Sequence, residues 1–217
     1  MMDSFRLCLV LGPLAIYLLL LGAINLSRRP FLVTGARDLA ALGVAVAGMV
    51  VVGPVELLLP EDAIHVYQSY VWLLLVVMYS LCLSLMVLLA RPRLTIYNMS
   101  LDEIRPVLAE AVAGLDADAL WAGNSLALPN LKVELHVETS PVMRNVSLVA
   151  NGDEQSYAGW RQLELSLAAR LGLVKAPPNP VGLVLALAAL FMFVALGWQL
   201  VAHPKAVAQG FREMLRL

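Results

Sequence analysis

Four long runs without a charged residue are the feature that most constrains the fold of this chain. They cover residues 7–27, 39–55, 63–90 and 176–204. A helix needs about 20 apolar residues to cross a hydrocarbon core of ~30 Å, and each run supplies that length once its flanks are included. We therefore expect four transmembrane helices, at about residues 7–26, 38–59, 67–90 and 181–201. A mean hydropathy of +0.80 agrees with such a chain.

The first run has to be distinguished from a secretory signal that is later removed. The apolar core of a signal is usually about 7–15 residues long and is followed by small residues at a cleavage site. Here the run is longer, and Ser27, Arg28 and Arg29 follow it. We interpret this segment as a retained membrane helix.

Charged residues concentrate between the third and the fourth run. Residues 91–180 carry 8 basic and 10 acidic side chains, so this stretch belongs in water. We divide the chain into three transmembrane helices (1–90), a soluble α+β domain (91–176), and the fourth transmembrane helix with a short tail (177–217). The tail repeats apolar residues at helical spacing, which is typical either of an amphipathic interfacial helix or of a frayed end. These residues are Val207, Phe211, Met214 and Leu215.

The pattern of the soluble stretch predicts short strands and two amphipathic helices. Ser100 and Glu103 have the spacing of a capping box, and an apolar face continues from there to Leu115. A second helix is expected at about 156–171. Strands are expected at 94–98, 126–128, 131–138 and 145–150. The order β-α-β-β-β-α predicts a small two-layer α+β domain, with both helices on one face of an antiparallel sheet.

Polar residues alternate with valine and leucine along the strand at 131–138. Lys132, Glu134, His136 and Glu138 should therefore form an exposed sheet face, which we regard as a speculative domain surface. Glu134, His136 and Glu138 have side chains that can bind a metal ion. Any solvated sheet face presents the same alternation, however, and we expect no metal or cofactor.

Glu56 is the ionisable residue closest to the interior of a predicted span. Intramembrane carboxylates often mark ion or proton paths. At 1.5 Å per residue, Glu56 lies only about 6 Å from Pro60, so an interfacial carboxylate is the simpler interpretation. An ion or proton site is the alternative.

Small residues in the second span favour close helix packing. Gly43, Ala47 and Gly48 have the spacing that lets helix backbones approach each other. Packing among the chain's own spans is the expected use, and a partner subunit is the alternative.

Basic flanks predict the orientation of the chain. One side of the membrane receives more of the helix-end arginines and lysines; these residues are Arg28, Arg29, Arg37, Arg91, Arg93 and Lys175. The positive-inside rule places this side, with the soluble domain, in the cytoplasm and both termini outside. The basic tail, with Lys205, Arg212 and Arg216, argues for the opposite orientation. We expect a bacterial inner (plasma) membrane.

The function is less constrained than the architecture. A net charge of −1 without a basic patch argues against nucleic-acid binding, and Cys8 and Cys82 fall in apolar runs. We expect a non-catalytic accessory, scaffold or sensory subunit that contacts the lipid bilayer and binds a protein partner through its cytoplasmic domain. One alternative is a small transporter or channel subunit that uses Glu56. Another is an enzyme acting on lipid at the interface, for which Glu56, His65 and His203 are candidates. No class of small-molecule ligand is indicated.

Overall fold

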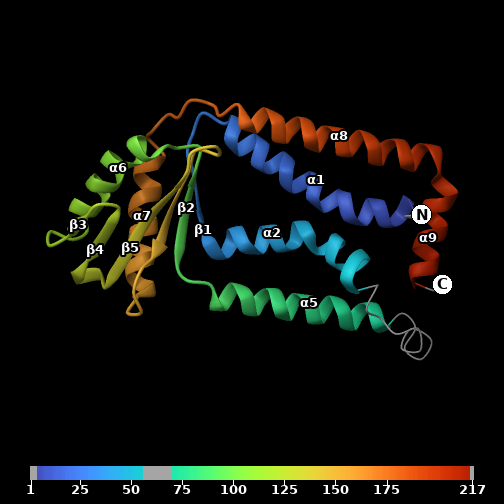
Figure 1. Cartoon of the computed structure of the whole chain (residues 1–217), viewed down its shortest axis with the longest axis horizontal. Coiled ribbons are helices and arrows are strands. Elements are labelled where there is room, and N and C mark those ends of the chain that lie inside the picture. Colours follow the sequence, from blue (N-terminus) through green and yellow to red (C-terminus); the bar gives the residue numbers. More distant parts are fainter. Residues whose placement is uncertain (1–3, 56–69, 216–217) are drawn as a thin grey trace. The chain divides into compact units, whose positions relative to one another are not determined.

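Four long apolar helices account for the four charge-free runs (Figure 1). In the computed structural model, residues 4–55 and 70–215 are described. The helices are α1 (Ser4–Leu26), α2 (Gly35–Val50, continued by a π-helical turn, η1, Val51–Val55), α5 (Tyr70–Leu89) and α8 (Val181–Ala202). Each is long and apolar enough to cross a membrane. The prediction of four apolar helices, three before and one after the insert, is confirmed, and these candidate spans suggest an integral membrane location.

The chain forms two compact units, which we describe separately. The helical unit comprises Met1–Leu21, Leu39–Leu89 and Leu185–Leu217, and the sheet unit comprises Gly22–Asp38 and Ala90–Val184. The sheet unit therefore includes the last turn of α1 and the first residues of α2 and α8. Its boundaries differ from those of an insert that begins after the third helix, because the segment between α1 and α2 contributes to the sheet.

In the helical unit, glycines of α2 face both neighbouring helices. A Cβ atom at Gly48 would collide with the backbone of Leu9 in α1, and one at Gly43 would collide with Leu83 in α5. The Tyr79 hydroxyl of α5 also donates a hydrogen bond of 2.6 Å to the Gly43 carbonyl. These glycines therefore pack the chain's own spans together, as the sequence suggested. A further helix, α9 (Pro204–Leu215), follows α8 and turns away from its axis (Figure 1).

The sheet unit contains six antiparallel strands in the order β1-β2-β6-β5-β4-β3. Their bounds are Phe31–Thr34 (β1), Arg93–Tyr97 (β2), Leu120–Ala122 (β3), Ser125–Leu128 (β4), Val133–Ser140 (β5) and Asn145–Ala150 (β6). A short 3-10 turn, η2 (Pro129–Leu131), separates β4 from β5. The α+β class is confirmed, but the predicted strand order was incomplete, because β1 and β3 were not foreseen. Both are edge strands of only three or four residues, too short to show an alternating pattern.

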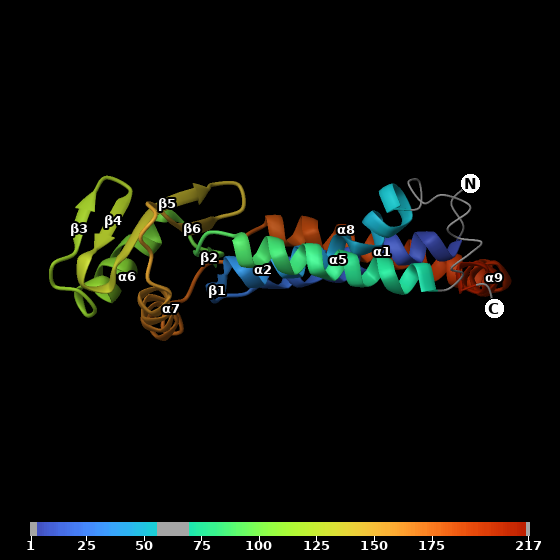
Figure 2. The same ribbon diagram turned by 90° about the horizontal axis from the view of Figure 1, so that it is seen from below.

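Two helices, α6 (Leu101–Ala113) and α7 (Tyr157–Leu171), cover one face of this sheet, as predicted (Figure 2). The core lies between these helices and the sheet. Leu135 of β5 and Leu148 of β6 are fully buried there, since alternate residues of a strand point to the same face. Trp160 of α7 completes the core, and its indole nitrogen donates a 2.9 Å hydrogen bond to the side chain of Gln155. The opposite face of the sheet is left for polar residues.

Buried asparagines fasten the ends of α1 and α8 to the rest of the sheet unit. The Asn179 side-chain amide donates to the Asn25 side chain (3.3 Å) and to the Met143 carbonyl (3.0 Å). The Asn98 side chain donates to the Ser27 carbonyl at 2.7 Å. Asn25, Asn98 and Asn179 are at most 2% exposed. Because buried polar groups are costly unless they are bonded, these contacts fix the helix ends in place.

Arg144 ties the turn between β5 and β6 to two other segments. Its Nη2 atom donates to both carboxylate oxygens of Glu103 at 2.9 Å, and its Nη1 donates to the Pro177 carbonyl at 3.1 Å. Glu103 also accepts from the Ser100 backbone N–H at 2.7 Å, so the predicted helix start is present. Partial burial raises the pKa of Glu103, but the hydrogen bonds from Ser100 and Arg144 outweigh it and hold the pKa below its usual value of 4.5.

Candidate functional site

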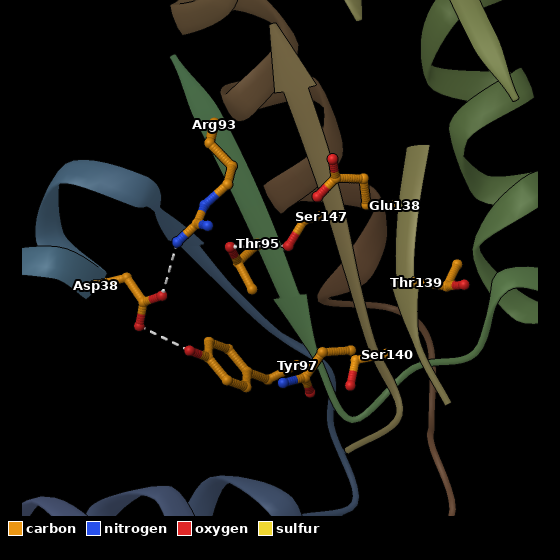
Figure 3. A pocket seen from close by; sticks show the side chains of 9 residues that line it. Asp38, Arg93, Thr95, Tyr97, Glu138, Thr139, Ser140 and Ser147 are labelled. Atoms are coloured by element: carbon orange, nitrogen blue, oxygen red, sulfur yellow. Dashed lines mark hydrogen bonds and ion pairs between the residues drawn. The ribbon is translucent and has the colours of Figure 1, made fainter. Parts of the chain in front are cut away.

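A polar cavity of about 240 Å³ lies on the sheet face that the helices leave uncovered (Figure 3). Side chains from α2, β2, β5 and β6 line it, and all of them are polar or charged. The residues that matter most for its chemistry are Asp38, Arg93, Thr95, Glu138, Asn145 and Ser147. All of them belong to the sheet unit.

The register of β2, β6 and β5 places the side chains of the cavity floor next to one another. Thr95 of β2 lies opposite Ser147 of β6, and Ser147 lies opposite Glu138 of β5. The Thr95 and Ser147 hydroxyl oxygens are 3.4 Å apart. Because neighbouring strands are about 4.8 Å apart, these three residues form one row across about 10 Å of sheet. Two hydroxyls and a carboxylate therefore face the same space.

Asp38 forms the wall of the cavity next to β2. Its carboxylate accepts a 2.7 Å hydrogen bond from the Tyr97 hydroxyl and a 3.3 Å bond from Arg93 Nη2 (Figure 3). The Arg93 side chain is 40% exposed and that of Asp38 is 20% exposed, so water screens part of the ion pair. Asp38 lies in the first turn of α2, where a negative charge is favoured by the helix dipole. This pair fixes the direction of the Arg93 guanidinium.

Of the four residues assigned to the speculative domain surface, only Glu138 lines the cavity. Lys132, Glu134, His136 and Glu138 are all exposed, and the alternation with buried residues is as expected. The His136 ring is 3.0 Å from the Ser125 hydroxyl, and Lys132 has a positive φ of 50° after η2. Within residues 4–55 and 70–215, no three His, Cys, Asp or Glu side chains lie close enough to hold a metal ion.

The remaining candidate residues from the sequence are Glu56, His65 and His203. Glu56 and His65 lie outside the described residues, so Glu56 as an ion or proton site remains a prediction. His203 is exposed and immediately precedes α9. Arg93 was predicted only as a basic flank of a membrane helix, and Asp38, Thr95 and Ser147 were not predicted as site residues. Nothing local marks these residues, because they meet only through the pairing of distant strands.

A second feature is the free edge of the sheet at β3. Leu120 is 66% exposed and Trp121 is 45% exposed, although both are large apolar side chains. β3 pairs with β4 through a two-residue turn in which Gly123 has a φ of 64°, a value that favours glycine. In the part of the chain that the structure describes, no strand pairs with the other side of β3.

The loop before β3 is held by a buried carboxylate. Asp116 is 3% exposed, and it accepts hydrogen bonds from the Asp118 backbone (3.0 Å) and from the Asn130 backbone (2.9 Å) and side chain. Burial raises the pKa of Asp116, but these hydrogen bonds outweigh it and lower the pKa overall. These hydrogen bonds hold the loop that leads into the free edge strand.

These features define the class of the protein. It is a candidate multi-pass membrane protein with an antiparallel α+β unit, which carries a polar cavity and an open sheet edge. No protein family model, curated protein or solved structure matches the chain.

Proposed function

We propose that the chain is a non-catalytic accessory subunit of a membrane complex, and that its sheet unit binds a protein partner at β3. An extended segment of the partner adds to β3 as a further strand. The observation that carries this proposal is the exposure of Leu120 and Trp121 on an edge strand. Edge strands present backbone N–H and C=O groups that another chain can pair with.

The position of β3 in the sheet supports this proposal. β1 directly precedes α2, and β2 begins at the fourth residue after Leu89, the last residue of α5. The strands joined to the candidate spans therefore lie at one side of the sheet. β3 lies at the opposite side, five strand spacings from β1, or about 24 Å. A partner strand that adds to that edge leaves the strands that are joined to the spans undisturbed.

The side chains of β3 suit a specific contact. Trp121 lies opposite Leu126, whose side chain is buried in the core, so the indole continues the apolar face of the sheet to its edge. Tryptophan is enriched among residues that dominate binding energy at protein interfaces. Leu120 and Trp121 point to opposite faces of the sheet, because they are consecutive residues of one strand. We infer that the partner segment carries two apolar residues, one that packs on Trp121 and one that packs on Leu120.

In this proposal the sheet unit lies in the cytoplasm. Arg28, Arg29 and Lys175 lie close to the ends of the candidate spans on the side of the sheet unit. Excess lysine and arginine beside membrane helices is typical of cytoplasmic loops. The partner is then a cytoplasmic protein or the cytoplasmic part of another membrane protein.

The proposal is tested by affinity purification of the tagged full-length chain in mild detergent. The variant combines Leu120→Ser with Trp121→Ser, and Val142→Ser is the matched control. Val142 is 75% exposed in the turn between β5 and β6, so the control also removes an exposed apolar side chain. A partner that co-purifies with the parent and the control should bind the double variant about 30-fold more weakly, since interface hot spots contribute about 2 kcal/mol or more.

Two results would contradict the proposal. The first is equal recovery of the same partner with the parent and the double variant. The second is recovery of the parent as a single species under conditions in which membrane complexes of the same cells remain intact.

A further inference from the structure

We propose that the polar cavity binds the phosphoethanolamine headgroup of a membrane phospholipid. Such a headgroup combines a phosphate diester with a primary ammonium group. This inference does not depend on a partner at β3, because the cavity is built from α2, β2, β5 and β6.

Two residues of the cavity lie close in sequence to the ends of candidate spans. Asp38 is the fourth residue of α2, about 5 Å from its start at 1.5 Å per residue. Arg93 is the fourth residue after the end of α5. The headgroup layer adds roughly 5–7 Å to each side of the hydrocarbon core. A ligand that enters this cavity from the membrane can therefore keep its acyl chains in the bilayer.

The β2 side of the cavity supplies hydrogen-bond donors for a phosphate. In the described part of the chain, Arg93 makes its single side-chain hydrogen bond with Asp38 through Nη2. A guanidinium has five N–H donors in a planar fork that matches phosphate oxygens, so several remain for a ligand. The hydroxyls of Thr95 and Ser147 lie beside it on the floor. A phosphate fits between these groups.

The β5 and β6 side supplies acceptors for an ammonium group. Glu138 makes no hydrogen bond or ion pair with the residues that the structure describes. Asn145 lies opposite Ser140, and its side-chain oxygen Oδ1 is buried without a hydrogen-bond partner. Buried acceptors without a donor are rare in folded proteins. A primary ammonium has three donors, which match Glu138, Asn145 and Ser140.

The size of the cavity suits a zwitterionic headgroup. Figure 3 shows Arg93 and Glu138 on either side of Thr95 and Ser147. The volume of about 240 Å³ is below that of drug-sized pockets, which is about 300–1,000 Å³. It accommodates a headgroup but not a whole lipid. A choline headgroup carries the same charges, but its ammonium has no N–H to donate to Asn145 or Glu138.

The test uses the purified full-length chain in detergent micelles. Dioleoylphosphatidylethanolamine and dioleoylphosphatidylcholine are titrated separately, and binding is read by native mass spectrometry. The parent should bind one molecule of the ethanolamine lipid per chain with a Kd at least about tenfold lower than for the choline lipid. This preference corresponds to one charge-assisted hydrogen bond.

Three variants separate the contributions. Glu138→Gln keeps the size of the side chain but removes its charge, and it should reduce the preference to about twofold or less. Glu134→Gln is the matched control, because Glu134 lies on the same strand and face but does not line the cavity. Thr95→Val should weaken both lipids equally, since both carry the phosphate. Thermal denaturation of each variant verifies that it is folded.

Equal affinity of the parent for the two lipids would overturn the proposal, and so would an unchanged preference in the folded Glu138→Gln variant. Glycerophosphoethanolamine, which lacks acyl chains, should fail to displace the lipid at a hundredfold excess. Displacement at concentrations similar to that of the lipid would overturn the assignment to a membrane lipid and identify a soluble ligand instead.

Discussion

Replacing Arg144 with methionine tests how strongly the turn between β5 and β6 is held in place. The substitution removes the hydrogen bonds to Glu103 and to the Pro177 carbonyl but keeps much of the apolar stem. Glu103 is 36% exposed, so its bond with Arg144 is screened and contributes about 1 kcal/mol rather than more. The bond to Pro177 contributes about another 1 kcal/mol. We expect Arg144→Met to lower the free energy of unfolding by about 2 kcal/mol.

A double-mutant cycle with Glu103→Gln isolates the ion pair from the contact with Pro177. At pH 7 the two substitutions should show a coupling energy of about 1 kcal/mol. Because the pKa of Glu103 is lower in the folded chain than its usual 4.5, the carboxylate stabilises the fold at pH values above that point. This stabilisation is lost as the pH falls through the lowered pKa. The coupling should therefore disappear in acid.

The measurement is urea unfolding of the full-length chain in micelles, followed by the fluorescence of Trp160, which lies in the core of the sheet unit. The other three tryptophans are replaced by phenylalanine so that one signal remains. Arg161→Met is the matched control, because Arg161 is 59% exposed and pairs at 2.8 Å with Glu164 of the same helix. It should cost less than about 0.5 kcal/mol. The reasoning would be refuted if Arg144→Met lowered the free energy of unfolding no more than Arg161→Met does. It would also be refuted if Arg144 and Glu103 showed no coupling energy at pH 7.

Two further predictions concern packing in the helical unit and the orientation of the chain. Gly48→Ala should lower the thermal denaturation temperature in micelles, since a Cβ atom would collide with the backbone of Leu9, whereas Gly12→Ala should not, because Gly12 has open space; equal effects would contradict the packing. Val142→Cys, in a background without Cys8 and Cys82, should react with an impermeant thiol reagent only after the cells are permeabilised. Labelling in intact cells would place the sheet unit outside.

The parts of the fold that the sequence predicted are those with a long or regular pattern. The four apolar helices follow from runs of uncharged residues, and β5 follows from strict alternation over eight residues. β1 (Phe31–Thr34) and β3 (Leu120–Ala122) have no such pattern. β1 is also stabilised by pairing with β2, about 60 residues away, and a contact of that kind leaves no local mark.

The candidate site was predictable only in part for the same reason. Glu138 could be recognised as an exposed polar residue of a strand. Asp38 and Arg93 look like ordinary charged flanks of membrane helices until the pairing of β1 with β2 brings them to 3.3 Å. The row from Thr95 to Glu138 depends on the register of three strands, and a shift by one residue would turn each side chain to the other face. The turn at Arg144, with its positive φ of 48°, helps to set that register.

The cavity and the free edge can be tested independently because they share no residues and lie well apart. β5 and β3 are separated by β4, so two strand spacings, or about 10 Å, lie between them. Trp121 lies in register with Leu126, and Leu126 with Leu135, three residues along β5 from Glu138, which adds about 10 Å along the strand. Substitutions farther apart than about 7–10 Å usually act additively. Loss of lipid preference in Glu138→Gln therefore tests only lipid binding in the cavity. Loss of a partner in the β3 variant tests only partner binding at the sheet edge.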